Sequence, residues 1–533
     1  MIIVVLLIGF FAELIYFLGI LHLYYPDFLI IVSLGFLLLE FYFIYRQKST
    51  LSANIKEFYT GLKQYDIVIL LLLILLVVIN YIGAISPELA FDALWYHLTL
   101  PKLYLSHHQI WHIPGGLLYY SDMPKLGEML YVSALSFGNE TLPKLLQFLA
   151  GIAICLSIYQ IAKKYLNQTY SLLAVLIFYS NIVVAWESTT AYIDLIRSLF
   201  EITALWSYIN FNETRKVKIL IITSLLLGFA VMSKLIALGS VAIFSLLLTA
   251  SSAKLIQERR LLKIFMFIFI SMLAPLPWFI FSYIHTGNPF YPFFTRVYPT
   301  TISLDLLNPL NFVVGLIKEL TMAADPISPI YLISIPLIII CWKSFPSRQK
   351  LILYYSILAL FVWYITPRTG GGRFLLPYLP AFSISAALLI KNLNASMYHF
   401  KLIRHLIIVM IVLISFTTIV YRGVASIRYI PVVIGQESKA QFLTNNLNFH
   451  FGDFYDTDGY FANHIKSSDK VLLIGFHNLY YVDFPFIDST WLRKGEKFDY
   501  IATQNTNLPD KYKSWKLVYK NKITMVNLYK KLD

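Results

Sequence analysis

The sequence predicts an all-α polytopic membrane protein that ends in a small α/β domain. Of its 533 residues, 58% are hydrophobic and only 14% are charged, whereas an ordinary soluble domain carries about 25% charged residues. The mean hydropathy of +0.67 agrees with that difference. Apolar runs recur along most of the chain, and after about residue 430 short strand-like runs replace them. The chain is therefore expected to cross the membrane many times.

Thirteen apolar segments approach the length of roughly 20 residues that a membrane-spanning helix needs. The first is expected to be a retained helix, because no basic region precedes it and no small-residue cleavage site follows it. Lys234 separates two short runs, 219–233 and 236–252, so that pair is the least certain of the set. The predicted spans are about 2–20, 27–45, 66–85, 144–162, 170–186, 192–210, 219–233, 236–252, 264–284, 327–342, 351–365, 374–391 and 405–421.

The basic residues predict the orientation of these spans. They concentrate in alternate loops, for example at Lys163 and Lys164 and in the stretch 254–263, and loops rich in Lys and Arg stay on the cytoplasmic side. The N-terminus is then inside and the C-terminal domain outside. The same loop clusters explain the net charge of +14, so membrane lipids are expected as partners and nucleic acid is not.

The longest outer loop, 86–143, contains the amphipathic runs WYHLTLPKLYL and KLGEMLYVSALSF. Such helices tend to lie in the headgroup plane. In the tail, a helix is predicted near 436–447, strands at 470–476 and 499–503, and a hairpin in WKLVYKNKITMVNLY. We therefore divide the chain into two additional N-terminal helices with a cytoplasmic loop (1–65), a transmembrane catalytic domain (66–425) and an extracytoplasmic α/β domain (426–533).

Asp92 is the first candidate for chemistry. It lies in FDALWYH, where a predicted span ends, with Glu88 four residues before it and His97 five after it. An acid solvated at the end of a helix is the plain alternative. Ionisable groups near hydrocarbon are costly, however, and usually have a partner or a function. We expect Asp92 to act as a general base and Tyr96 and His97 to contact substrate.

Asp194 is the second candidate, in ESTTAYIDLIRSLF near the outer end of a predicted span. Arg197 follows three residues later, so both side chains share one helix face. Two interpretations remain open. The residues form a structural ion pair, or Asp194 faces a cavity with Asp92 while Arg197 binds an anionic group.

Further cations lie on the outer side of the predicted membrane, where basic residues are otherwise sparse. They are Lys102, Lys234, Arg368 and Arg373. Snorkelling toward headgroups explains any single one of them, but together they predict a phosphate-bearing lipid substrate. Arg373 is the best candidate, because the glycines before it allow close approach and a guanidinium matches phosphate oxygens.

No cofactor is predicted. The histidines of the first loop show no strong metal-ligand spacing, so a divalent metal is possible but not expected. The triple glycine lacks the residues of a phosphate-binding P-loop, and no GxSxG motif is present. The two cysteines, Cys155 and Cys341, lie in apolar segments and imply no disulfide framework.

Four segments together resemble the GT-C membrane glycosyltransferases, above all the protein O-mannosyltransferases and the lipid A aminoarabinose transferases. They are FDALWYHLTLPKLYL, GFAVMSKLIAL, HTGNPFYPFF and GGRFLLPYLPAF, and they span most of residues 66–391. Many relatives carry paired acids at the first motif, whereas Ala93 follows Asp92 here, which leaves metal dependence open. The two spans before residue 66 look like an addition to the usual fold.

The resemblance implies an inverting glycosyltransferase in the cytoplasmic membrane of a bacterium. Its donor would be a hexose or pentose on a polyprenyl phosphate, and its acceptor hydroxyl would belong to a lipid, a glycan or a protein. Asp92 and Asp194 would be catalytic, and Arg373, with Lys234 or Arg197, would hold the leaving phosphate. The full set of expected substrate-binding residues is Glu88, Tyr96, His97, Lys102, Arg197, Lys234, Arg368 and Arg373.

Three other functions were weighed. A lipid-linked glycan flippase would also need cations, but the ionisable residues cluster toward the outer half and no inverted repeat is visible. A surface-polysaccharide polymerase or ligase outside GT-C would have a similar composition but no essential acid in the first loop. A non-catalytic scaffold ranks last, because it leaves Asp92 and Asp194 unexplained.

Overall fold

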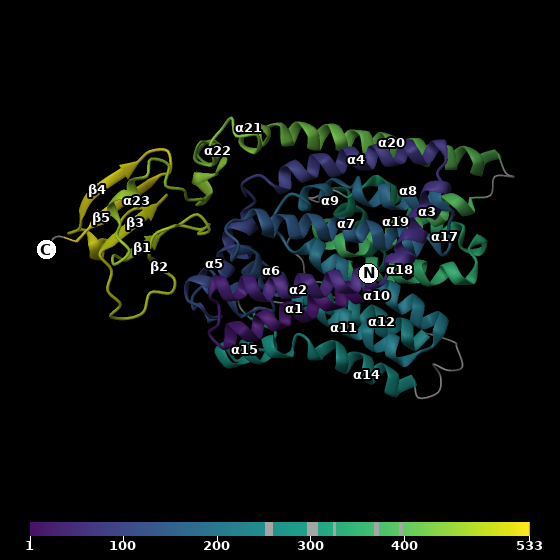
Figure 1. Cartoon of the computed structure of the whole chain (residues 1–533), viewed down its shortest axis with the longest axis horizontal. Helices are drawn as coiled ribbons and strands as arrows, with labels where there is room; N and C mark the ends of the chain where they lie inside the picture. Colours follow the sequence, from purple (N-terminus) through teal and green to yellow (C-terminus); the bar gives the residue numbers. More distant parts are fainter. Residues whose placement is uncertain (251–259, 296–307, 323–326, 367–371, 394–397, 532–533) are drawn as a thin grey trace.

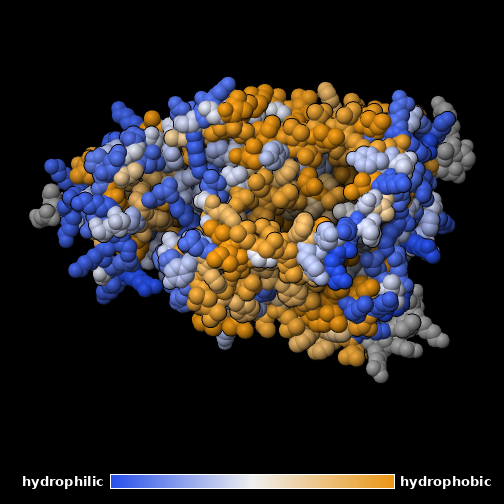
Figure 2. Space-filling view, viewed as in Figure 1, coloured by the Kyte–Doolittle hydropathy of each residue, from blue (hydrophilic) through white to orange (hydrophobic). Residues whose placement is uncertain are grey.

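Long helices run side by side along one direction, and a small β-sheet domain lies at one end of the bundle (Figure 1). The computed structural model describes residues 1–250, 260–295, 308–322, 327–366, 372–393 and 398–531. Apolar side chains form a broad band across the middle of the bundle, and hydrophilic ones gather at both ends (Figure 2). The predicted fold class, a helical membrane protein with a small C-terminal α/β domain, is confirmed.

A helix occupies each of the thirteen predicted ranges, but the count of thirteen spans is not confirmed. Among the described residues, six helices are long and apolar enough to cross a membrane, or seven if the bent pair α14–α15 is one span. The six are α1 (Ile2–Ile20), α2 (Pro26–Arg46), α4 (Gln64–Ala84), α7 (Thr141–Lys163), Gly372–Asn392, which joins η6 (Gly372–Tyr378) to α19 (Leu379–Asn392), and α20 (Tyr398–Ile427). The bend between α14 (Arg260–Leu273) and α15 (Leu276–Thr286) is 62°.

The remaining helices of the bundle are shorter or carry more charge. The predicted spans 219–233 and 236–252 are two separate helices, α11 (Val217–Ser233) and α12 (Leu238–Ala250). The helices are separate because Lys234 between them has an extended backbone with φ −159° and ψ 123°. The others are α3 (Lys48–Thr60), α8 (Gln168–Tyr179), α9 (Ile182–Glu187), α10 (Asp194–Thr214), α16 (Pro309–Met322), α17 (Pro329–Ile340) and α18 (Ser347–Ile365).

Part of the loop 86–143 packs inside the helical bundle. All residues of α6 (Leu126–Leu135) are buried, because α1, α5 (Thr99–Ser106) and α7 pack against it. The segment KLGEMLYVSALSF is thus covered by other helices, and its expected place in the headgroup plane stays a prediction. Before α5, the residues Ala93–His97 form the single π-helical turn η1, closed by a 2.9 Å bond from the Leu98 amide to the Ala93 carbonyl.

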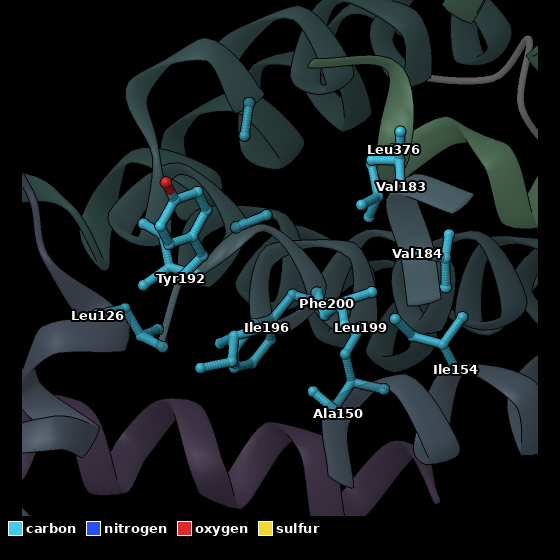
Figure 3. Close-up of a cluster of buried hydrophobic side chains, with 14 of the residues drawn as sticks. Leu126, Ala150, Ile154, Val183, Val184, Tyr192, Ile196, Leu199, Phe200 and Leu376 are labelled. Carbon is cyan, nitrogen blue, oxygen red and sulfur yellow. The ribbon is translucent and has the colours of Figure 1, made fainter. Parts of the chain in front are cut away.

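Apolar packing fixes the outer part of the bundle. Figure 3 shows side chains of α6, α7, α9 and α10 in one cluster, with the Tyr192 ring on the side of Leu126 and Ile196. These residues are buried. A dense apolar interior leaves little room for alternative side-chain positions, so the segments before η1 and α10 are held in a defined arrangement.

The C-terminal domain contains a five-stranded sheet of order β2-β1-β3-β5-β4. β1 is parallel to β2 and β3, while β5 is antiparallel to β3 and β4. The predicted helix, the strands at 470–476 and 499–503 and the hairpin are all present, whereas β2, only three residues long, was not predicted. The elements are α22 (Lys439–Asn446), α23 (Tyr460–His464), β1 (Val471–Ile474), β2 (Phe486–Asp488), β3 (Tyr500–Gln504), β4 (Lys516–Asn521) and β5 (Val526–Lys530).

Candidate active site

An acid and an arginine from distant parts of the chain meet at the end of the bundle near the C-terminal domain. Asp92 lies directly before η1, and Arg373 lies in the first turn of η6. The Arg373 Nη1 donates to Asp92 Oδ2 at 3.0 Å. The two side chains are 15% and 18% exposed for Arg373 and Asp92. The pair is thus shielded by protein but still open to a ligand.

A second acid–cation pair lies beside the first. Lys234, at the break between α11 and α12, donates to Asp194 Oδ1 at 2.8 Å. The Lys234 side chain is 18% exposed, whereas that of Asp194 is buried. The Phe374 ring joins the two pairs, because its centroid lies 4.8 Å from Lys234 Nζ and 5.5 Å from Arg373 Cζ. Two cations therefore share one aromatic face, an arrangement that holds positive charge in place.

Tyr192 connects the two pairs through the backbone. Its hydroxyl accepts a bond of 3.2 Å from the Asp92 amide, and the Arg373 guanidinium lies 5.0 Å from its ring centroid. The Tyr131 hydroxyl donates to the Tyr192 carbonyl. Sequence reasoning missed Tyr192 and Phe374, although each lies within two residues of a predicted site residue.

Glu88 ties the chain before Asp92 to the chain before Tyr192. Its Oε1 accepts from the Leu89 and Ala90 amides at 2.8 Å each, and its Oε2 accepts from the Ala191 amide at 2.5 Å. The residue is buried. Both carboxylate oxygens thus bind backbone, so the structure shows Glu88 holding the site together, and its predicted contact with substrate stays a prediction.

Three other predicted residues of the first loop have partners away from Asp92. His97 Nδ1 lies 2.7 Å from Glu128 Oε1, and both side chains are buried. The buried Tyr96 ring stacks on Tyr120 at 3.8 Å. Lys102 donates to two carbonyl oxygens of the C-terminal domain, those of Tyr480 at 2.6 Å and Val482 at 2.9 Å, and to Asp483. Their roles in substrate binding stay predictions.

Arg197 does not pair with Asp194. Its Nε donates to Glu201 Oε1 at 2.7 Å, and both side chains are buried. Position 201 lies one turn further along the same face of α10, so the proposed structural pair exists with a different acid. Arg368 lies outside the described residues.

Two buried polar residues next to this site were not predicted. Gln147 Nε2 donates to Glu187 Oε2 at 3.0 Å, and the Ile196 amide donates to Gln147 Oε1 at 3.2 Å. Glu187 is completely buried and ends α9 in the motif WESTT. Within the described ranges, no group of three or more His, Cys, Asp or Glu side chains is arranged to hold a metal ion.

Comparison with known proteins addresses the fold and the family. Residues 131–279, which include Asp194, Arg197 and Lys234, match the sequence profile described as dolichyl-phosphate-mannose-protein mannosyltransferase. The solved structure of ArnT from Cupriavidus metallidurans bound to undecaprenyl phosphate is 11% identical, with a TM-score of 0.56 over 86% of this chain and 97% of that chain. The chain therefore has the fold of ArnT.

Two further structures are similar. The apo form of the same ArnT is 12% identical, with a TM-score of 0.52 over 86% of this chain and 97% of that chain. The oligosaccharyltransferase AglB from Archaeoglobus fulgidus, in complex with an inhibitory peptide and a dolichol-phosphate, is 12% identical with a TM-score of 0.46 over 81% of this chain and 69% of that chain. No curated protein sequence matches the chain. The predicted resemblance to these glycosyltransferases is confirmed, in residues 131–279 by the sequence profile and in the fold by ArnT.

Proposed function

We propose that this chain transfers a sugar from a polyprenyl-phosphate donor to an acceptor hydroxyl at the extracytoplasmic face, with inversion at the anomeric carbon. The observation that carries the proposal is the pair of Asp92 and Arg373, 3.0 Å apart and partly exposed. A base for the acceptor and a cation for the phosphate are thereby within one hydrogen bond of each other. The similar ArnT structure was solved with undecaprenyl phosphate bound, which supports a lipid-linked donor.

In the proposed reaction, Asp92 takes the proton from the acceptor hydroxyl while that oxygen attacks the anomeric carbon. The bond from this carbon to the phosphate oxygen breaks, and its electron pair leaves with the polyprenyl phosphate. The attack comes from the side opposite the leaving group, so the configuration inverts. A carboxylate for the acceptor hydroxyl and a cation for the leaving phosphate are the chemical groups that this displacement needs.

Arg373 and Lys234 stabilise the negative charge that develops on the leaving phosphate. Arg373 uses only Nη1 for Asp92, and its Nε has no partner among the residues that the structure describes. A guanidinium presents its N–H groups in a planar fork that matches phosphate oxygens. Asp194, buried beneath Lys234, orients that ammonium group rather than contacting the acceptor.

We assign each of the three predicted parts of the chain a role in this function. Residues 66–425 carry the site, residues 426–533 lie over its outer end, and residues 1–65 add helices to the bundle. We place the N-terminus in the cytoplasm of a bacterium and the C-terminal domain beyond its inner membrane, in agreement with the basic loops.

The test is donor turnover by the full chain in lipid nanodiscs. Undecaprenyl-phosphate-linked hexoses and pentoses serve as donors, and released undecaprenyl phosphate is measured, since a flippase releases none. Asp92→Asn should lower release by about 10³-fold while the yield and the unfolding temperature stay at the wild-type level. Asp510→Asn, at an acid whose side chain is 89% exposed, is the matched control. Wild-type turnover by Asp92→Asn would refute the assignment.

A further inference from the structure

Aromatic rings from two parts of the molecule meet beside Asp92. Phe91 and Trp95 come from the two ends of the motif FDALW, and His477 comes from the loop after β1 in the C-terminal domain. The His477 ring centroid lies 4.8 Å from that of Phe91 and 4.5 Å from that of Trp95. The π-helical turn η1 places Phe91 and Trp95 one turn apart, 5.8 Å between centroids, with Asp92 next to them.

These rings are fixed in position but are not core residues. Phe91 is 39% exposed, and Trp95 and His477 are half-buried. The Trp95 Nε1 donates to the Leu117 carbonyl at 2.9 Å, and the Tyr120 ring meets the indole edge to face at 5.1 Å. We call Phe91, Trp95 and His477 the aromatic platform.

The C-terminal domain holds His477 in one orientation. The Asn478 Nδ2 donates to Asp453 Oδ1 at 2.6 Å, so the amide oxygen faces His477 Nδ1 at 2.9 Å. Nδ1 then carries the hydrogen, and Nε2 of the neutral ring is an acceptor. The His477 and Asn478 amides both donate to the Gly452 carbonyl, at 3.2 and 3.0 Å. Gly452 has φ +87°, and a Cβ there would lie 2.7 Å from His477 Cβ, so glycine permits this close approach.

We propose that the aromatic platform binds a pyranose ring of the acceptor, so that the acceptor of this enzyme is a saccharide. The proposal rests on the function proposed above and names its acceptor class. The C–H groups on one face of a pyranose carry slight positive charge, and the faces of aromatic rings are negative. The aromatic platform lies beside Asp92, the proposed base, and the His477 Nε2 can accept a hydrogen bond from a sugar hydroxyl. These features fit a pyranose ligand.

The location favours the acceptor over the donor sugar. The donor phosphate is assigned to Arg373 and Lys234, whereas the platform includes a residue of the C-terminal domain, which lies beyond the apolar band (Figures 1 and 2). A polar acceptor approaches from that side. Interfacial aromatic residues also anchor membrane proteins in headgroups. Here, however, Trp95 and Phe91 face a histidine of the same chain rather than projecting singly into lipid.

The experiment uses the full chain in nanodiscs on an array of bacterial surface oligosaccharides. We expect the wild type to bind at least one pyranose-containing glycan and His477→Ala and Phe91→Ala to weaken that binding by about tenfold. His477→Gln keeps an acceptor but loses the ring, so its affinity for the glycan should lie between those of the wild type and His477→Ala. Phe451→Ala, at an aromatic residue of the same domain that is 68% exposed, is the matched control and should bind as the wild type does. Unfolding temperatures identify any variant that fails to fold, in which case Phe91→Ala and His477→Gln decide.

The outcomes separate this proposal from the function on which it rests. A chain that releases undecaprenyl phosphate from donor but binds no glycan, or whose platform variants bind glycans like the wild type, refutes the platform alone. Glycan binding without any release refutes the proposed function alone. With the bound glycan as acceptor, His477→Ala should raise the acceptor KM by about tenfold with a smaller change in kcat. Equal binding of free glycan by His477→Ala, with loss only of the sugar-loaded donor, would assign the rings to the donor and overturn the proposal.

Discussion

Two arginine–carboxylate pairs in the membrane domain differ in burial and in sequence separation. The pair of Asp92 and Arg373 joins segments 281 residues apart, and its side chains are 18% and 15% exposed. The pair of Arg197 and Glu201 lies on one turn of α10, with side chains 1% and 0% exposed. The same chemistry therefore occurs once where a ligand has access and once where none does.

The surroundings of the buried pair explain how α10 tolerates it. The Ser240 hydroxyl donates to Glu201 Oε2 at 2.5 Å and lies 3.1 Å from the Tyr378 hydroxyl. Removing two charges from water is costly, and only close geometry with further hydrogen bonds offsets that cost. Glu201 has such a further partner in the Ser240 hydroxyl, and Arg197 has Glu201 itself. Asp92 and Arg373 differ from them in exposure, because part of each side chain stays accessible to a ligand.

Breaking the buried pair should have the largest effect on stability. Glu201→Gln leaves the Arg197 charge buried without its counter-ion, so we expect the free energy of unfolding to fall by about 3–5 kcal/mol. Thermal unfolding in detergent, monitored by size-exclusion chromatography, measures this loss. Asp92→Asn in the same assay should unfold near the wild-type temperature, because its partner is partly exposed.

A double variant sharpens this comparison. Replacing both members with apolar residues, as in Arg197→Met with Glu201→Leu, removes both buried charges and should recover much of the lost stability. If Glu201→Gln unfolds at the wild-type temperature, or the double variant unfolds below the single one, the two pairs do not differ in the way that their burial implies.

Arginine-to-lysine substitutions should separate the pairs by activity. Arg373→Lys keeps the charge but loses the planar fork that matches phosphate, so donor turnover should fall by about 10²-fold with little change in unfolding temperature. Release of undecaprenyl phosphate in nanodiscs measures it. Arg197→Lys should instead lower the unfolding temperature. Equal turnover by Arg373→Lys and wild type would show that this arginine does not hold the phosphate.

The sequence allowed the members of the exposed pair to be predicted, but not their contact. An acid at the end of an apolar run and an arginine after three glycines are both unusual, and each was selected for that reason. Their pairing depends on the path of the 280 residues between them, on which a local pattern carries no information. In α10, the acid that pairs with Arg197 is Glu201 rather than Asp194, a difference within one helix. Positions 194 and 201 both share a face with Arg197, and only the packing of α11 and α12, which brings Lys234 to Asp194, decides between them.

The fold, too, could be predicted from the sequence only in part. Hydropathy located a helix in every predicted range, because burial in lipid or protein demands apolar sequence in either case. For that reason hydropathy did not separate long spans from short inner helices such as α8 and α17. For α6, a run that reads as amphipathic is buried along its whole length, because α1, α5 and α7 pack around it.

A third pair joins an exposed side chain to a buried one and extends the comparison to pH. Lys439 of α22 lies 2.7 Å from Glu140 Oε1, with side chains 44% and 3% exposed. Burial alone would raise the pKa of Glu140, but Lys439 and the Tyr481 hydroxyl outweigh it and hold the pKa below the ordinary value of 4.5. The pair thus stabilises the docking of the C-terminal domain above pH 4.5, and this contribution disappears as the pH falls through the lowered pKa.

We expect the smallest effect here, a loss of less than about 1 kcal/mol, because water screens Lys439. Hydrogen exchange of the amides of α22 at pH 7 and near pH 4, corrected for the intrinsic rates, should show less protection at the lower pH in the wild type. In Glu140→Gln, protection should be reduced at both pH values and the difference between them should vanish. The same pH response in that variant would mean that another group controls the docking. An exposed lysine would then contribute as little as its accessibility suggests, and burial of both partners would be what separates a pair that holds the fold from one that does not.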